Sequence, residues 1–171
     1  SRDEVDAIFY LLFLAGVDTV AAMLTFIANY LAHNQELYQK IKSDKAFLDK
    51  ATDELLRMHA FINLNRICEA DTEFHGVTFK QGDNIVVPSF VTDRDASTFP
   101  DPHNFNQERS KVERNMHHAF GDGPHKCIGM HLAKLEVKIV LEEFAKRVDS
   151  FSITDESKIT AHGGTTMGMD N

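Results

Sequence analysis

The chain has 171 residues, of which 43% are hydrophobic, so it is long enough to bury a sizeable hydrophobic core. Its 26 acidic and 18 basic residues give a formal net charge of -8, which argues against nucleic-acid binding because that function requires a basic surface. The two cysteines, Cys68 and Cys127, fit neither a disulfide framework nor a Cys-x-x-Cys metal site. We therefore expect a reducing, cytoplasmic setting.

The first predicted element is a long helix over residues 2–32. Residues 7–28 are apolar enough and numerous enough to cross a bilayer. However, Asp18 lies near the middle of this stretch, where a charge costs roughly 2.5–3.5 kcal/mol on insertion scales. The residues before the stretch are acidic instead of lysine- or arginine-rich. We therefore predict that the helix spans no membrane and is covered by protein on nearly every side.

The remaining elements indicate a mainly α protein with small β-sheets. Two short helices are predicted at 35–41 and 47–58, and strands at 61–68, 73–79 (with a turn at His75 and Gly76) and 84–88. Residues 93–119 show no periodicity, which is typical of a segment wrapped on other structure. A helix follows at 128–147, with Leu132, Leu135, Ile139, Val140 and Phe144 facing inward. A short strand at 150–154 and a glycine-rich tail end the chain.

Cys127 stands in the stretch FGDGPHKCIG, residues 120–129, immediately before the last predicted helix. A thiolate is favoured at a helix N-terminus, and the glycines allow backbone N–H groups to point at the sulfur. Gly129 leaves room for a flat and bulky group. Two other interpretations of the residues stay open. Cys127 could be a buried structural cysteine, or it could bind zinc with His131, four residues further along one helical face.

The spacing Phe120-x-x-Gly123-x-x-x-Cys127-x-Gly129 resembles the haem-binding loop of the cytochrome P450 family, the haem-thiolate monooxygenases. Three other stretches resemble parts of that family in the same order. AGVDT (15–19) is similar to the oxygen-activating part of its long central helix, and ELLR (54–57) to its Glu-x-x-Arg pair. DRDASTFPDPHNF (93–105) is similar to the meander on the proximal side of the haem. EFHGVTFKQGD (73–83) points towards the soluble bacterial, camphor-monooxygenase-like members.

The resemblance implies a set of cofactor-binding residues. Cys127 would supply the axial thiolate of haem b, and Arg66 and His125 would bind the haem propionates. The other implied haem contacts are Phe120, Gly121, Gly129 and Ala15. Glu54 and Arg57 would form a buried structural pair with the meander. The family usually carries Arg or His before the meander phenylalanine, whereas Asn104 stands before Phe105 here, so the third arm of this ion-pair cluster has no candidate.

The resemblance also implies the catalytic side of the haem. Gly16 would leave room for a ligand, although a glycine inside a helix costs roughly 1 kcal/mol relative to alanine. Asp18 and Thr19 would deliver protons to O2. The residues alone also allow Thr19 to bond back to its own helix. The substrate-facing residues implied by analogy are Val17, Val20, Phe61, Leu64, Thr165 and Thr166, and their mostly apolar character indicates a small hydrophobic substrate.

The implied reaction inserts one oxygen atom of O2 into the substrate, with electrons from a ferredoxin that docks near Lys126, Lys134 and Lys138. Members of the family are considerably longer than this chain, so we interpret residues 1–171 as the C-terminal haem-binding portion, without the N-terminal half. The apolar helix at 2–32 would then need cover, and we expect an oligomer or pairing with that half. A truncated, non-catalytic haem-binding or haem-sensing protein is the alternative function.

Overall fold

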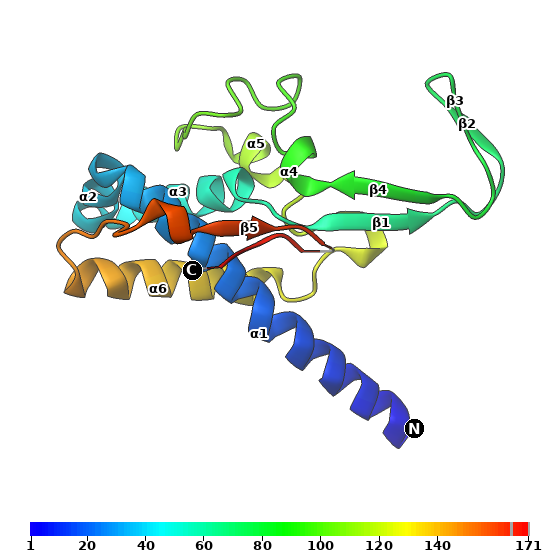
Figure 1. Ribbon diagram of the computed structural model, residues 1–171, viewed down its shortest axis with the longest axis horizontal. Helices are drawn as coiled ribbons and strands as arrows, with labels where there is room; N and C mark the ends of the chain where they lie inside the picture. Colours follow the sequence, from blue (N-terminus) through cyan, green and yellow to red (C-terminus); the bar gives the residue numbers. More distant parts are fainter. Residues whose placement is uncertain (165, 171) are drawn as a thin grey trace.

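The computed structural model describes residues 1–164 and 166–170 and confirms the predicted mainly α fold with small β-sheets (Figure 1). The helices are α1 (Arg2–His33), α2 (Gln35–Ser43), α3 (Lys45–Met58), α4 (Ser89–Thr92), α5 (Lys111–Asn115) and α6 (Met130–Arg147). Short 3₁₀ turns are found at Gly123–His125 and Glu156–Lys158. The strands are β1 (Asn63–Ile67), β2 (Thr72–Phe74), β3 (Val77–Phe79), β4 (Asn84–Pro88), β5 (Thr160–His162) and β6 (Gly168–Asp170).

Side-chain caps explain where two of the helices begin. The hydroxyl of Ser1 accepts the backbone N–H of Glu4 at 3.2 Å, and the Glu4 carboxylate reaches back to the N-terminus. This arrangement is a capping box. The carboxylate of Asp44 accepts the backbone N–H groups of Ala46 and Phe47, so α3 begins earlier than the predicted residue 47.

The hydrophobic core lies where the second half of α1 meets α2, α3 and α6 (Figure 1). Its buried members are Met23, Ile27, Leu31, Tyr38, Ile41, Leu48, Ala51, Leu55, Leu56, Phe61, Val137, Leu141 and Ala145. Tyr38 donates its hydroxyl hydrogen to the carbonyl of Val148 at 2.7 Å, which satisfies the one polar atom of this large buried side chain.

Helix α6 presents a different face to the core from the predicted one. Val137, Leu141 and Ala145 are buried, whereas Leu132 is 61% exposed and Ile139 is 47% exposed. Leu135, Val140 and Phe144 are also among the exposed large hydrophobic residues. The prediction of the inward face was therefore wrong, because the face that α6 buries in the core with α1, α2 and α3 is the one that carries Val137, Leu141 and Ala145. The helix also begins at Met130, two residues later than predicted.

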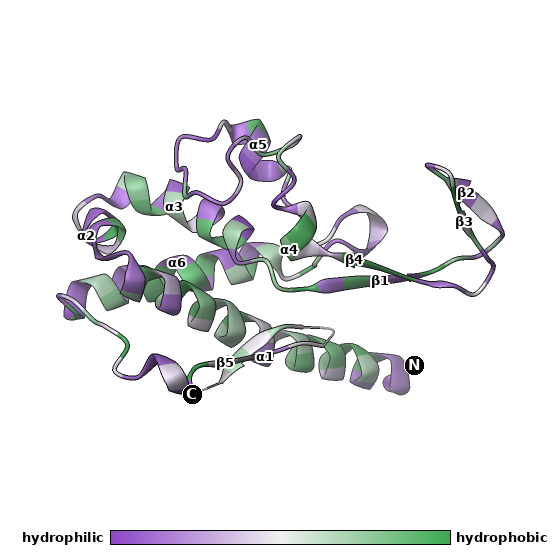
Figure 2. Cartoon of the chain, turned by 45° about the horizontal axis from the view of Figure 1, so that its top comes forward, coloured by the Kyte–Doolittle hydropathy of each residue, from purple (hydrophilic) through white to green (hydrophobic). Residues whose placement is uncertain are grey.

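The first half of α1 projects from the rest of the chain, and apolar residues lie along its whole length (Figures 1 and 2). Phe9 is 69% exposed and Phe13 is 72% exposed, while Met23, Ile27 and Leu31 are the buried residues of the helix. The prediction that protein covers α1 on nearly every side is not met within this chain. Among the described residues, α1 is the one helix whose length and composition would also suit a membrane span.

The strands form three small antiparallel pairs. β1 pairs with β4, β2 with β3 and β5 with β6, and the β2–β3 hairpin extends away from the core (Figure 1). The predicted strand at 150–154 is wrong. The carbonyl of Phe151 instead accepts a hydrogen bond from Gln35 Nε2 at 2.9 Å, and its ring packs edge-on against Tyr38. Side-chain contacts, and not a sheet partner, hold this segment.

Candidate functional site

A cavity of about 250 Å³ lies between α1 and the loop that precedes α6. Predicted site residues that line it are Thr19, Val20, Phe61, Leu64, Phe120, Gly121, His125 and Cys127. The other lining residues are Met23, Leu56, Ile62, Ala119, Ala133 and Val137, so most of the wall is apolar. The fold thus brings eight predicted residues from three separate segments to one cavity.

The loop that carries Cys127 is closed by its own backbone. Gly121 donates its N–H to the carbonyl of His118 at 2.9 Å, and Cys127 donates its N–H to the carbonyl of Phe120 at 2.9 Å. Gly121 and Gly123 have φ angles of 68° and 69°, which residues other than glycine rarely adopt. A Cβ at Gly129 would lie 3.8 Å from Cys127 Sγ. The sulfur therefore sits at the end of a rigid turn, beside a residue without a side chain.

Cys127 is exposed, so it is not the buried structural cysteine that the residues alone allowed. Nor do residues 1–164 and 166–170 contain a group of three or more His, Cys, Asp or Glu side chains that could hold a metal ion, which is what the zinc interpretation requires. A single soft sulfur donor in an apolar cavity instead fits a cofactor that brings most of its own metal ligands.

Helix α1 contributes Thr19 and Val20 to the cavity, but not the residues just before them. Thr19 donates its hydroxyl hydrogen to the carbonyl of Ala15 at 2.7 Å, the back-bonded arrangement considered above. Gly16, Val17 and Asp18 are exposed, and a Cβ added at Gly16 would meet no atom within 4 Å. Ala15 is exposed as well, so the structure separates these four predicted residues from the cavity lining.

Arg66, Gly129 and Thr166 are also absent from the residues that line the cavity. Arg66 is exposed on β1 and donates from Nη1 to the carbonyl of Asn65 at 2.8 Å. Thr166 is half-buried and forms an isolated β-bridge with Ile62. Thr165 lies outside the described residues.

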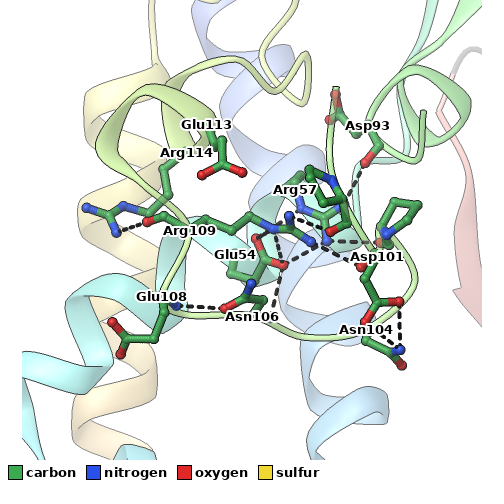
Figure 3. A network of polar contacts seen from close by, with 12 residues as sticks. Glu54, Arg57, Asp93, Asp101, Asn104, Asn106, Glu108, Arg109, Glu113 and Arg114 are labelled. Atoms are coloured by element: carbon green, nitrogen blue, oxygen red, sulfur yellow. Dashed lines mark hydrogen bonds and ion pairs between the residues drawn. The ribbon is translucent and has the colours of Figure 1, made fainter. Parts of the chain in front are cut away.

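A buried ion-pair cluster joins helix α3 to the segment at 93–109 (Figure 3). Glu54 and Arg57 have side chains that are each 1% exposed, and Arg57 binds both carboxylate oxygens at 2.8 and 3.0 Å. Arg109 donates from Nε to the same two oxygens at 3.0 and 3.1 Å. Because two guanidinium groups share one carboxylate, the second positive charge needs other partners. The face of the buried Phe99 ring, 5.2 Å from Arg57 and 5.8 Å from Arg109, is one of them.

Arg109 is the third arm of this cluster, and the sequence analysis missed it. Asn104, the residue considered for that position, is exposed and donates to the carboxylate of Asp101. One feature of the sequence could have identified it. Arg109 follows Phe105 by four residues and is the only arginine between Arg94 and Arg114. The family resemblance implied a basic residue before Phe105, whereas in this chain the basic residue of the cluster, Arg109, follows it.

Asp93 and His118 form a second buried contact that the sequence did not reveal. Asp93 is 0% exposed, and its Oδ1 accepts the backbone N–H of His118 at 2.6 Å. The Nδ1 atom of His118 lies 3.6 Å from the same oxygen. Burial raises the pKa of Asp93 from 3.8 to about 6, although the His118 N–H and the charges of His118 and Arg57 act in the opposite direction. Next to this pair, burial lowers the pKa of His117 to about 4, so that imidazole is neutral at pH 7.

The raised pKa of Asp93 predicts how stability depends on pH. The folded chain retains this proton up to about pH 6, whereas the unfolded chain releases it near pH 3.8. The contribution of Asp93 to stability is therefore fully present below about pH 4 and is lost as the pH rises to about 6. Urea unfolding of Asp93→Asn and the parent across this window should show that the parent loses stability relative to the variant. A constant difference between the two would contradict the raised pKa.

The lysines near the cysteine loop differ in their partners. Lys134 pairs with Asp53 at 2.9 Å, and Lys138 pairs with Asp49 at 2.5 Å. Lys126 is exposed at the end of the 3₁₀ turn. Internal ion pairs therefore already engage two of the three lysines that were predicted to receive an electron donor.

Comparisons with known proteins identify the family of this chain. The sequence profile of the cytochrome P450 family matches residues 1–161. The chain is 37% identical, over all of its length, to a Sinorhizobium fredii protein described as probable cytochrome P450 127A1, and covers 41% of it. It is 30% identical over 99% of its length to vitamin D3 dihydroxylase of Streptomyces griseolus, and covers 42% of that protein.

Among solved structures, the crystal structure of CYP101J2 matches with a TM-score of 0.90 and 32% identity. That match covers 99% of this chain and 43% of the other. The chain thus spans about two fifths of the length of the relatives it matches. With the profile matching nearly the whole sequence, the chain belongs to the cytochrome P450 family.

Proposed function

We propose that this chain is the C-terminal haem-binding portion of a haem-thiolate monooxygenase and that Cys127 is the axial ligand of haem b. The observation that supports this proposal best is the cavity in which Cys127, on a glycine-shaped loop, and Thr19, on α1, line the same apolar space. When bound, haem supplies the O2-activating chemistry, and a thiolate ligand favours cleavage of the O–O bond.

Other predicted residues would bind the haem propionates, contact the macrocycle and hold the sulfur in place. His125, beside Cys127 in the lining, would bind one haem propionate, and Arg66 would bind the other once its side chain leaves the Asn65 carbonyl. Phe120, Gly121, Gly129 and Ala15 would contact the macrocycle. The rigid backbone of residues 120–127 would hold the sulfur in place, and its N–H groups would moderate the sulfur charge.

On α1, Asp18 and Thr19 would deliver protons, and Gly16 would leave space beside the helix. Thr19 already lines the cavity, and its hydroxyl would have to leave the Ala15 carbonyl to act. Asp18 is exposed, so it could exchange protons with water. We assign substrate contact to Val17, Val20, Phe61, Leu64, Thr165 and Thr166. Val20, Phe61 and Leu64 belong to the apolar cavity lining, which supports a small hydrophobic substrate.

The partner of this portion would be a ferredoxin in the cytoplasm. It would dock on the face that carries the cysteine loop, where Lys126 offers an exposed positive charge. A non-catalytic haem-binding or haem-sensing protein is the second candidate. The exposed Cys127 favours it, because a reaction centre normally excludes water during turnover.

Two measurements test these functions. An absorption spectrum of the chain reconstituted with haem and carbon monoxide should show the red-shifted Soret band of thiolate ligation. NADPH consumption with a ferredoxin and its reductase, coupled to product formation, separates a monooxygenase from a protein that only holds haem. The absence of any haem spectrum would rule out both candidates.

The exposed apolar surface predicts association. Phe9 and Phe13 on α1 and Leu132 on α6 are large, exposed and apolar, and contiguous surfaces of this kind mark interfaces. We expect the isolated 171-residue chain to sediment as a dimer or larger oligomer, or to bind the N-terminal half when the two are mixed. Phe9→Ser combined with Phe13→Ser should shift the distribution towards monomer. A compact monomer of the parent at micromolar concentration, with full coupled turnover, would contradict this expectation.

A further inference from the structure

Asp93 connects two parts of the structure that are distant in sequence, one through its backbone carbonyl and the other through its carboxylate. On one side, Arg57 of the ion-pair cluster donates from Nη1 to the backbone carbonyl of Asp93 at 2.5 Å (Figure 3). On the other side, Asp93 Oδ1 accepts the backbone N–H of His118 at 2.6 Å. A single residue, itself 0% exposed, therefore joins helix α3 to the segment that leads to Cys127.

The contacts continue from His118 to the cysteine without a gap. The carbonyl of His118 accepts the N–H of Gly121, and the carbonyl of Phe120 accepts the N–H of Cys127, both at 2.9 Å. Displacing His118 would therefore loosen the turn at Gly121 and, through it, the position of the sulfur. No other hydrogen bond links the His118 backbone N–H to the body of the described chain.

We propose that Asp93 is a positioning residue for the cysteine loop, and that its carboxylate acts through the backbone N–H of His118. The proposal rests on the proposed function, because it assigns the loop the task of holding a thiolate ligand. A carboxylate is a stronger acceptor than a neutral group, which suits it to fixing the position of the loop.

The charges around Asp93 are consistent with this role. Arg57 and Arg94 lie close enough to interact electrostatically with it, and the His118 imidazole faces it from the loop side. Asp93 Oδ2 and His118 Nδ1 are both buried and have no hydrogen-bond partner among the described residues. Of the two carboxylate oxygens of Asp93, Oδ1 accepts a hydrogen bond and Oδ2 does not. The bond from the His118 N–H is therefore the hydrogen bond through which the Asp93 side chain can hold the loop.

The test compares Asp93→Ala with Asp93→Asn in the haem-free protein, by amide hydrogen exchange at single residues. Loss of a hydrogen bond to a charged acceptor raises the equilibrium constant of local opening by roughly tenfold or more. In Asp93→Ala we expect the Gly121 and Cys127 amides to exchange about tenfold faster, while amides of α2 keep the parent rate. Asp93→Asn retains an acceptor oxygen and should restore most of the protection. Asp93→Ser, whose hydroxyl is too short to reach, replaces the alanine variant if that variant does not fold.

A control variant separates the backbone bond from the imidazole. His118→Leu keeps the N–H donor and should retain protection of Gly121 and Cys127. Equal acceleration in His118→Leu and Asp93→Ala, or acceleration that includes α2, would overturn the proposal. The reconstituted protein gives a second readout, because a loosened loop should lower the fraction of thiolate-type Soret band in Asp93→Ala and not in Asp93→Asn. If the parent shows no haem spectrum, the proposed function fails while the exchange rates still decide the role of Asp93.

Discussion

Replacing Cys127 with serine is expected to abolish the thiolate-type Soret band of the reconstituted protein with carbon monoxide. A serine hydroxyl is almost the same size as a thiol, so the loop closed by Phe120 and Gly121 should persist. It is not ionised near neutral pH, however, and it is a poor donor to a soft metal centre. The variant should therefore lose the thiolate-type Soret band but remain folded. Circular dichroism can verify that its secondary structure is retained.

Cys68 provides the matched control for this experiment. It is the other free cysteine, it lies at the end of β1, and its thiol donates to the carbonyl of Ala70 at 2.9 Å. Cys68→Ser should leave the Soret band unchanged. If the Soret band is unchanged in Cys127→Ser, another residue must be the axial ligand, and His131 and Cys68 would be the next positions to substitute.

Replacing Arg57 with alanine should lower the free energy of unfolding by about 3–5 kcal/mol, the cost typical of removing one partner of a buried ion pair. The side chain is 1% exposed and holds both oxygens of Glu54, together with the carbonyls of Asp93 and Pro102. Arg109 would keep its contacts with both oxygens of Glu54, so the carboxylate would be partly compensated. The carbonyls would remain buried without a donor, which adds to the cost.

Lys50 is the matched control, because it lies on the same helix and forms an ion pair that water can reach. It pairs with Glu108 at 3.3 Å, and the two side chains are 44% and 67% exposed. Exposed pairs contribute about 0–1 kcal/mol, so Lys50→Ala should change the denaturant midpoint little. Equal midpoints for Arg57→Ala and the parent would show that the cluster contributes nothing to stability.

Local patterns in the sequence predicted the elements of this fold well. Helical periodicity placed α1, α2 and α3 within a few residues of their bounds, and the His75-Gly76 turn placed the β2–β3 hairpin. The residues that line the cavity near Cys127 were predicted through the resemblance of the spacing at 120–129 to the haem-binding loop of the family. These features depend on residues that are neighbours along the chain.

Features that depend on distant neighbours were not predictable in the same way. The buried face of α6 depends on where α1, α2 and α3 pack, so apolar residues on two sides of the helix left the choice ambiguous. Arg109 meets Glu54 across 55 residues of sequence, and Asp93 meets His118 across 25. Neither pair leaves a periodic signal. The segment at 150–154 has the composition of a strand but lacks a neighbouring strand to pair with.

The two buried arginines hold the meander by its main chain. Arg57 binds the carbonyls of Asp93 and Pro102, and Arg109 binds those of Pro100 and Asp101. Every amino acid carries the same carbonyl oxygen, so these contacts fix the path of the segment without specifying its side chains. Substitutions of the exposed side chains of this segment should therefore leave its course unchanged, provided that Glu54, Arg57 and Arg109 are retained.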